Sequence, residues 1–234
     1  MSLIQIHHLT FRYDGGTEDI FQDVNLQLDS SWRLGLLGRN GRGKTTFLHL
    51  LEGKYEYGGT ITAPVCFSYF PYEVEAPEQK TQTVVDTILP DGASWRMEKE
   101  LHHLGTSPAV LERPFETLSK GEQTKVLLAA LFLRENAFLL IDEPTNHLDL
   151  AGRQLVREYL RRKNGYILVS HDRAFLDGCV DHILSINRAN LELQKGNYST
   201  WLQNKTMQDR FELEQNEKLK KEIRRLQDAA GRTA

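Results

Sequence analysis

Short apolar segments alternate with polar turns in the first part of the chain. Residues 3–13 and 24–29 place apolar side chains at partly alternating positions, and the turn-rich residues 14–19 lie between them. This alternation predicts β-strands. A continuous apolar segment at residues 34–37 then enters a glycine-rich loop, which is followed by the leucine-rich residues 46–51. The change of pattern predicts a strand, a loop and a helix in succession.

The middle of the chain, about residues 71–134, has a helical pattern that prolines and glycines interrupt repeatedly. These interruptions predict a separate small helical lobe, which we place at about residues 73–134. Two apolar segments follow at residues 137–142 and 166–170, and a helical segment separates them. Strands that alternate with helices predict a parallel sheet.

The last part of the chain becomes strongly polar. Residues 182–186 and 191–194 predict a β-hairpin. From about residue 204 to residue 228 apolar side chains recur mostly every three or four positions, and a cluster of lysines and arginines lies between them. This pattern predicts a charged helix with an apolar stripe.

The overall charge does not suggest a protein that binds nucleic acid with its whole surface. The 234 residues carry a formal net charge of -3 at pH 7, so contact with DNA or RNA would need a local patch. We see no signal peptide, and no apolar segment approaches the roughly 18 residues needed to span a bilayer. We therefore expect a soluble, cytoplasmic protein without a membrane partner.

The two cysteines, Cys66 and Cys179, lie far apart in the sequence and in apolar surroundings. Two buried free thiols in a reducing compartment explain this better than a disulfide or a metal site does. We therefore expect both side chains to be buried.

Residues 38–45 read GRNGRGKT and fit the phosphate-binding pattern G-x-x-x-x-G-K-[ST]. The match follows an apolar strand and opens a helix, which is where such a loop belongs. Backbone N–H groups of residues 41–46 would surround the β-phosphate, Lys44 would reach the β and γ oxygens, and Thr45 would bind Mg²⁺. A dinucleotide-binding turn is the competing interpretation, but the segment lacks the third glycine of that motif.

Asp142 and Glu143 stand at the end of the apolar segment 137–142. Adjacent residues point to opposite sides of a strand, so Asp142 can hold Mg²⁺ while Glu143 addresses the attacking water. His171 follows the next apolar segment and should lie in the same row of loops, where a neutral imidazole can contact the γ-phosphate. We predict Glu143, His171 and Lys44 as catalytic residues, and Thr45 and Asp142 as metal ligands.

Four motifs, GRNGRGKT, LSKGEQ, LLIDEPTNHLD and SHD in that order, resemble those of ATP-binding-cassette (ABC) nucleotide-binding domains. The resemblance covers nearly the whole chain and implies an ATP hydrolase that uses ATP and Mg²⁺. It implies an α/β P-loop NTPase fold of ABC type, with a mixed core sheet, an antiparallel β subdomain and a small α-helical subdomain. On this basis residues 1–203 form the nucleotide-binding domain and residues 204–234 begin a charged linker helix.

The resemblance also implies specific contacts. The residues expected to bind the nucleotide are Tyr13, which would stack on adenine, and Gly38, Arg39, Asn40, Gly41, Arg42, Gly43, Lys44, Thr45 and Thr46. The signature residues Ser119, Lys120, Gly121 and Glu122 would bind a nucleotide held by an opposing cassette. Three positions depart from the family pattern. Tyr72 stands where a Gln usually contacts Mg²⁺, Lys120 replaces the more usual Gly, and Glu122 replaces the usual Gln of transporters.

Among the cassettes, the segment PTNHLD with His147, the small lobe and the charged tail are similar to the ABC-F family, whose soluble members carry two cassettes in tandem and act on the ribosome. The segments GRNGRGKTT and RPFETLSKGEQTKVLL resemble its Lsa-like and Vga-like antibiotic-target-protection branch. This implies contact with the ribosome, rRNA and tRNA. It also implies a second cassette beyond Ala234, or a second copy of this chain, that completes each ATP site.

Other interpretations stay open. The chain could be the ATPase subunit of an ABC membrane transporter, although Tyr72, the segment TNHLD and the charged tail count against this. A DNA-repair type of ABC ATPase would usually carry a long coiled coil or a zinc module, which the sequence does not show. Housekeeping ABC-F factors share most of the same motifs. The charged tail also suits a solvated helix that packs on its own partner helix.

Overall fold

A six-stranded mixed sheet forms the centre of the molecule. In the computed structural model, which describes residues 2–89, 93–187 and 190–230, its strands follow the order β5-β6-β7-β3-β8-β9. Their bounds are β3 Arg33–Leu37, β5 Cys66–Phe70, β6 Ala137–Asp142, β7 Tyr166–Val169, β8 His182–Asn187 and β9 Asn190–Lys195. Neighbouring strands are parallel except β8 and β9, which form the predicted hairpin with residues 188–189 of its turn outside the described residues.

Alternate residues of the central strands enter two separate hydrophobic cores. On β6, Leu139 and Ile141 pack into the first core, and Phe138 and Leu140 into the second. Because both faces of these parallel strands are covered, almost every residue along them is buried. That is why the strands read as continuous apolar segments in the sequence.

A three-stranded antiparallel sheet covers the second core. Its order is β2-β1-β4, with bounds β1 Leu3–Phe11, β2 Phe21–Asp29 and β4 Gly58–Thr62. Helix α1 (Lys44–Glu52) inserts Phe47 and Leu48 into this core, where both are fully buried. Burial of such a side chain contributes about 1.5–3 kcal/mol. This antiparallel subdomain therefore helps to anchor the helix that begins at the glycine-rich loop.

Short helices cover the first core between residues 81 and 133. They are α2 Thr81–Ile88, α3 Met97–His103 and α4 Lys120–Leu133, with 3-10 turns η1 Ala93–Arg96, η2 Pro108–Glu112 and η3 Phe115–Thr117. Glu100 of α3 accepts hydrogen bonds from Lys163 at 2.6 Å and from Tyr159 of α5 (Leu150–Arg161). This contact ties the helical region to the central domain, whereas the exact limits of a lobe at residues 73–134 stay a prediction.

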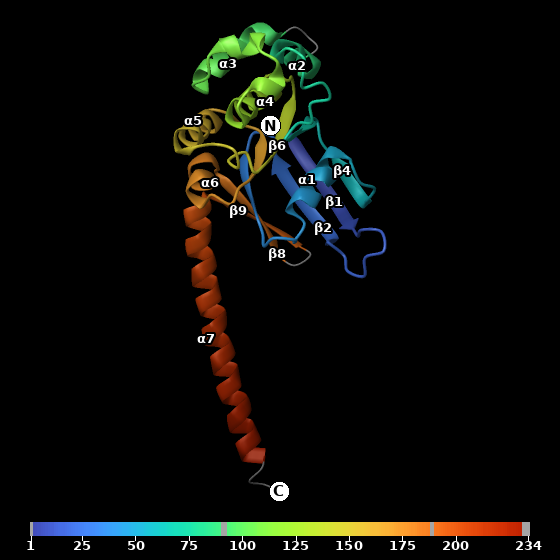
Figure 1. The fold of residues 1–234 in the computed structure, drawn as a ribbon. Helices are drawn as coiled ribbons and strands as arrows, with labels where there is room; N and C mark the ends of the chain where they lie inside the picture. Colours follow the sequence, from blue (N-terminus) through green and yellow to red (C-terminus); the bar gives the residue numbers. More distant parts are fainter. Residues whose placement is uncertain (1, 90–92, 188–189, 231–234) are drawn as a thin grey trace.

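Helix α7 (Tyr198–Ala230) extends away from the domain (Figure 1). It starts against α6 (Arg173–Cys179), where Asp177 Oδ1 accepts a hydrogen bond from the Ser199 N–H at 2.6 Å. The helix begins before residue 204, and residues 231–234 of the predicted linker segment lie outside the described residues.

The two ends of α7 have different surroundings. Tyr198 and Trp201 pack against the first core. Farther along, large apolar side chains are more than half exposed, namely Met207, Phe211, Leu213, Leu219 and Ile223. None of the described helices combines the length and the apolar character required to cross a membrane.

The cysteines differ from the prediction that both are buried. Cys179 is a buried free thiol, and burial raises its pKa to about 12. Cys66 is also free but exposed. It is the first residue of β5, which is an edge strand of the sheet, so apolar neighbours in the sequence do not enclose it.

Candidate functional site: a phosphate-binding loop at the strand ends

Three neighbouring parallel strands bring most of the predicted site residues to one edge of the sheet. β6, β7 and β3 are adjacent in the sheet although they are far apart in the sequence. Parallel strands end at the same edge, so Asp142, His171 and Gly38 come together there. A cavity of about 420 Å³ lies at this edge, and the predicted residues that line it are Tyr13, Asn40, Gly41, Gly43, Lys44, Thr45, Thr46, Asp142, Glu143 and His171.

The glycine-rich loop has the shape of a phosphate cradle. Gly43, with φ 91°, directly precedes α1, and a Cβ atom there would lie 2.6 Å from the Ile20 side chain. No side chain caps the first turn of α1, which leaves backbone N–H groups directed at the cavity. The Lys44 ammonium donates to the Gly38 carbonyl at 2.9 Å and lies 3.4 Å from Asn40 Oδ1. The loop therefore offers N–H groups and one cation to a phosphate.

The hard oxygen donors expected for Mg²⁺ lie together. The Thr45 hydroxyl donates a hydrogen bond to Asp142 Oδ2 at 2.7 Å. A hydroxyl and a carboxylate beside a phosphate cradle match the oxygen ligands that Mg²⁺ prefers. The residues at this position thus fit the metal, and Thr45 and Asp142 would hold it.

Glu143 is held in an unusual conformation next to His171. Its φ is 48°, a region that residues other than glycine rarely adopt. Glu143 Oε2 accepts a hydrogen bond from the His171 backbone N–H at 3.2 Å, and Oε1 lies 3.4 Å from His171 Nε2. Oε1 is buried and has no hydrogen-bond partner among the described residues. Burial raises the pKa of Glu143, partly offset by these two contacts with His171.

Tyr13 lies at the mouth of the same cavity. Its hydroxyl is 2.7 Å from the Thr46 hydroxyl, and its ring packs edge-on against Phe11 and Tyr55. The residue is 43% exposed, so the fold does not enclose it. An adenine contact at this ring stays a prediction.

The two arginines of the loop face a different hollow. Arg39 and Arg42 are exposed and line a groove of about 990 Å³ between the loop and the start of α7. Arg173 and Lys205 line the same groove. Lys44 and His171 line both this groove and the smaller cavity, whereas the two arginines line only the groove. Their predicted nucleotide contact stays a prediction.

The signature residues begin helix α4 and do not line the phosphate cavity. Ser119 caps the helix by accepting a hydrogen bond from the Glu122 N–H at 3.2 Å, while the Glu122 carboxylate accepts from the Ser119 N–H at 2.8 Å. This reciprocal contact lowers the pKa of Glu122. Lys120 donates to Gln123 Oε1 at 3.0 Å. Ser119 and Lys120 are exposed, so the start of α4 is accessible from outside even though the Glu122 N–H is capped.

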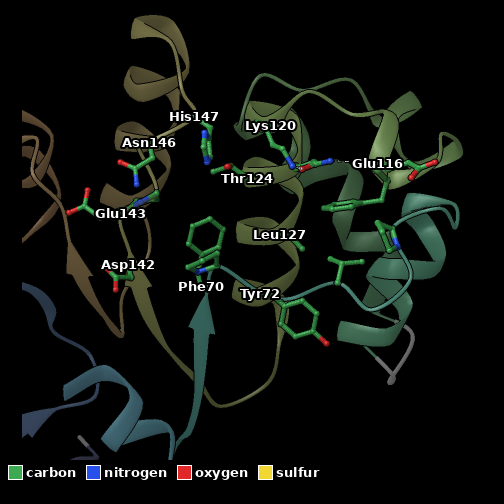
Figure 2. A pocket seen from close by; sticks show the side chains of 16 residues that line it. Phe70, Tyr72, Glu116, Lys120, Thr124, Leu127, Asp142, Glu143, Asn146 and His147 are labelled. Atoms are coloured by element: carbon green, nitrogen blue, oxygen red, sulfur yellow. Dashed lines mark hydrogen bonds between the residues drawn. The ribbon is translucent and has the colours of Figure 1, made fainter. Parts of the chain in front are cut away.

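A second cavity, of about 540 Å³, separates the helical region from the strand ends. Figure 2 shows Asp142 and Glu143 on one side of it and Lys120 on the other. Tyr72 packs against the first core and points away from the two carboxylates (Figure 2). The residue at the usual Gln position therefore does not approach Asp142 in this structure.

Sequence reasoning missed two contacts of the site. The Tyr69 hydroxyl donates a hydrogen bond to Asp142 Oδ2 at 3.2 Å, and nothing in the spacing of the motifs indicated it. The capping pair Ser119 and Glu122 did have a local signal, because Ser followed three residues later by Glu is the pattern of a capping box.

The ABC transporter family matches residues 21–146, more than half of the chain. The chain is similar to the ribosome protection protein VmlR of Bacillus subtilis (strain 168), with 32% identity over 76% of this chain and 34% of that protein. It is also similar to ABC transporter F family member 2 of Arabidopsis thaliana, with 27% identity over 93% of this chain and 33% of that protein. The chain thus spans about a third of the length of these two relatives.

The solved structure of a bacterial Atm1-family ABC exporter with ATP bound has the same fold. The TM-score is 0.70 at 19% identity, over 87% of this chain and 40% of that chain. Together with the loop, the carboxylate pair and the strand order, these likenesses identify the domain. The chain belongs to the ABC transporter family and is an ATP-binding domain of that family.

Proposed function

We propose that this domain hydrolyses ATP as the first cassette of a tandem ABC-F protein that acts on the ribosome and protects it from antibiotics. The observation that carries hydrolysis is the joint placement of a phosphate cradle, the Thr45–Asp142 pair and the Glu143–His171 pair around one cavity. The similarity to a ribosome protection protein supports the ribosome as the partner, and the similarity to an F family member supports the ABC-F assignment.

Each side chain has a defined part in the proposed reaction. Lys44 and the N–H groups at the start of α1 bind the phosphates and stabilise the negative charge that develops on them. Glu143, whose buried Oε1 lacks a partner among the described residues, accepts a hydrogen bond from the attacking water. His171 contacts Glu143 and lines the cavity, and we propose that it contacts the γ-phosphate. When bound, Mg²⁺ would neutralise phosphate charge, with Thr45 and Asp142 as its protein ligands.

The signature residues lie away from the cavity in which we place this domain's own nucleotide. Ser119 and Glu122 begin α4 and are absent from the residues that line the phosphate cavity. The start of α4 provides N–H groups and a favourable dipole for a phosphate. We infer that a second cassette, in the same protein or in a second copy, supplies the nucleotide there.

The charged helix supports a ribosomal function over a transporter function. α7 extends from the domain (Figure 1). Between Met207 and Ile223 it exposes apolar and basic side chains. The exposed lysines Lys218, Lys220 and Lys221 lie close together on this helix and can contact phosphate groups, although acidic residues such as Glu214 and Glu217 lie beside them. We propose contact with rRNA and tRNA through this region.

Sedimentation with ribosomes tests the proposal. We expect the natural full-length protein carrying Glu143→Gln to pellet with ribosomes through a sucrose cushion in ATP and not in ADP, because the variant binds ATP without hydrolysing it. A matched control adds Lys44→Ala, which should abolish the ATP-dependent fraction. Absence of any nucleotide-dependent association would refute the ribosomal function, and recovery with a membrane protein complex would favour the transporter alternative.

Relief of drug inhibition tests the protective function separately. The unmodified protein should restore peptide synthesis in a translation extract inhibited by a ribosome-targeting antibiotic. Ribosome binding without such relief across the main drug classes would indicate a translation factor rather than a resistance protein.

A further inference from the structure

Tyr69 contacts the metal-binding carboxylate from the edge of the sheet. It lies on β5, where it pairs with Leu140 of β6, two residues before Asp142. Its hydroxyl donates to Asp142 Oδ2 at 3.2 Å, and the Thr45 hydroxyl donates to the same oxygen at 2.7 Å. Within the described part of the chain no donor is hydrogen-bonded to Oδ1. One carboxylate oxygen is therefore fixed by two hydroxyl groups while the other remains available.

The Tyr69 ring is itself held in place by neighbours. The His49 ring lies 4.7 Å from it between centroids, and the Lys54 ammonium lies 5.0 Å from the ring centroid. Glu52 contacts both of these neighbours, at 3.4 Å from His49 Nδ1 and 3.1 Å from Lys54 Nζ. These contacts restrict the Tyr69 ring and keep its hydroxyl within hydrogen-bonding distance of Asp142.

Other residues of the same segment do not make this contact. Tyr72 points toward the helical region, and Phe70 is apolar and buried in the first core. Tyr69 is therefore the polar side chain by which this segment reaches Asp142 in the structure. The segment continues directly into the wall of the cavity between the strand ends and the helical region.

We propose that Tyr69 is a positioning residue for the Mg²⁺ site: its hydroxyl fixes the rotation of the Asp142 carboxylate so that Asp142 and Thr45 are ready to hold the metal. This inference rests on the proposed ATP hydrolysis and extends it to a residue outside the motifs. A hydrogen bond to a metal-binding carboxylate orients it and affects metal affinity, typically by about tenfold or more. The inference concerns metal affinity and not folding.

Tyr69→Phe tests the proposal because it removes only the hydroxyl and keeps the ring between His49 and Lys54. Mn²⁺ can replace Mg²⁺ as a probe, and its binding in the presence of ATP can be followed by electron paramagnetic resonance. We expect the Mn²⁺ affinity of the full-length protein to fall about tenfold. ATP affinity measured in EDTA should stay unchanged. The Mg²⁺ concentration for half-maximal hydrolysis should rise by a similar factor.

Tyr57→Phe is the matched control. Tyr57 packs against the second core, and its hydroxyl has no hydrogen bond within the described residues. We expect this variant to keep the wild-type Mn²⁺ affinity and melting temperature. The comparison shows whether a loss of Mn²⁺ affinity comes from removing the hydroxyl that contacts Asp142 or from removing any tyrosine hydroxyl.

Two results would overturn the positioning role while leaving ATP hydrolysis intact. One is a Mn²⁺ affinity of Tyr69→Phe equal to that of the wild type. The other is an equal loss of Mn²⁺ affinity and metal-free ATP affinity together with a lower melting temperature, which would indicate a purely structural role. Failure of the wild-type protein itself to bind Mn²⁺ with ATP would instead overturn the proposed function, and with it this inference.

Discussion

His171 contacts Glu143 at both carboxylate oxygens. The backbone N–H of His171 donates to Oε2 at 3.2 Å, and the imidazole Nε2 lies 3.4 Å from Oε1. The Glu143 side chain is only 17% exposed, whereas that of His171 is 65% exposed. A largely enclosed carboxylate is therefore oriented by an accessible residue of the neighbouring strand end.

Replacement of Glu143 by Gln should reduce ATP hydrolysis at this site by about a hundredfold or more, because loss of a general base typically costs 10²–10⁴ in rate. ATP affinity should change little, since the cradle and Lys44 are untouched. Phosphate release and fluorescent-nucleotide binding by the full-length protein measure the two effects. Unchanged hydrolysis, with the other cassette inactivated, would show that another group is the base.

The same substitution should stabilise the nucleotide-free fold at neutral pH. Burial raises the pKa of Glu143, so the folded state binds its proton more readily than the unfolded chain does. The charged carboxylate therefore destabilises the fold above both pKa values, and this effect disappears as the pH falls below the ordinary value of 4.5. We expect Glu143→Gln to raise the melting temperature at pH 8 and to raise it less toward pH 5.

A melting series from pH 5 to pH 8 checks this prediction, with Glu214→Gln on the exposed helix α7 as the control. A stabilisation that is equal at all pH values would contradict the electrostatic explanation. It would point to a packing difference between Glu and Gln.

Two substitutions of Tyr13 separate its ring from its hydroxyl. If the ring stacks on adenine, Tyr13→Ala should weaken ATP binding about tenfold, since stacking of a base on an aromatic ring contributes about 1–3 kcal/mol. Tyr13→Phe loses only the contact with Thr46 and should bind ATP nearly as well as the wild type. Titration with a fluorescent ATP analogue compares them. Equal losses in both variants would assign the contribution to the hydroxyl instead.

Asp177 should stabilise the start of helix α7. Its carboxylate accepts a hydrogen bond from the Ser199 N–H in the first turn, where an anion also interacts favourably with the helix dipole. Asp177→Ala should cost about 1 kcal/mol, the usual cost of losing a helix cap. Hydrogen exchange at residues 198–201 should accelerate. Asp177→Asn keeps a hydrogen-bond acceptor, so it should lose less stability than Asp177→Ala. Equal exchange rates in the Asn and Ala variants would show that the hydrogen bond does not protect these residues.

Much of the fold could be predicted because the relevant patterns are local. The continuous apolar segments before Gly38, Glu143 and His171 indicated buried parallel strands, and the structure confirms all three. The burial of Cys66 was wrongly predicted, because the sequence does not show that β5 lies at an edge of the sheet. The hydrogen bond between Tyr69 and Asp142 joins residues on paired strands far apart in the sequence, so no spacing could indicate it.

The sequence by itself determined the chemistry available to this domain: a glycine loop that tolerates positive φ, a lysine, a threonine and a pair of acids after an apolar strand. The tertiary structure decided which of these groups meet. The order β6-β7-β3 places three separate strand ends side by side. It is also the tertiary structure that brings the Tyr69 hydroxyl to the Asp142 carboxylate and packs Tyr72 against the first core. The physical reason is that residue type and local periodicity are encoded along the chain, whereas strand order follows from burying both faces of the sheet at once.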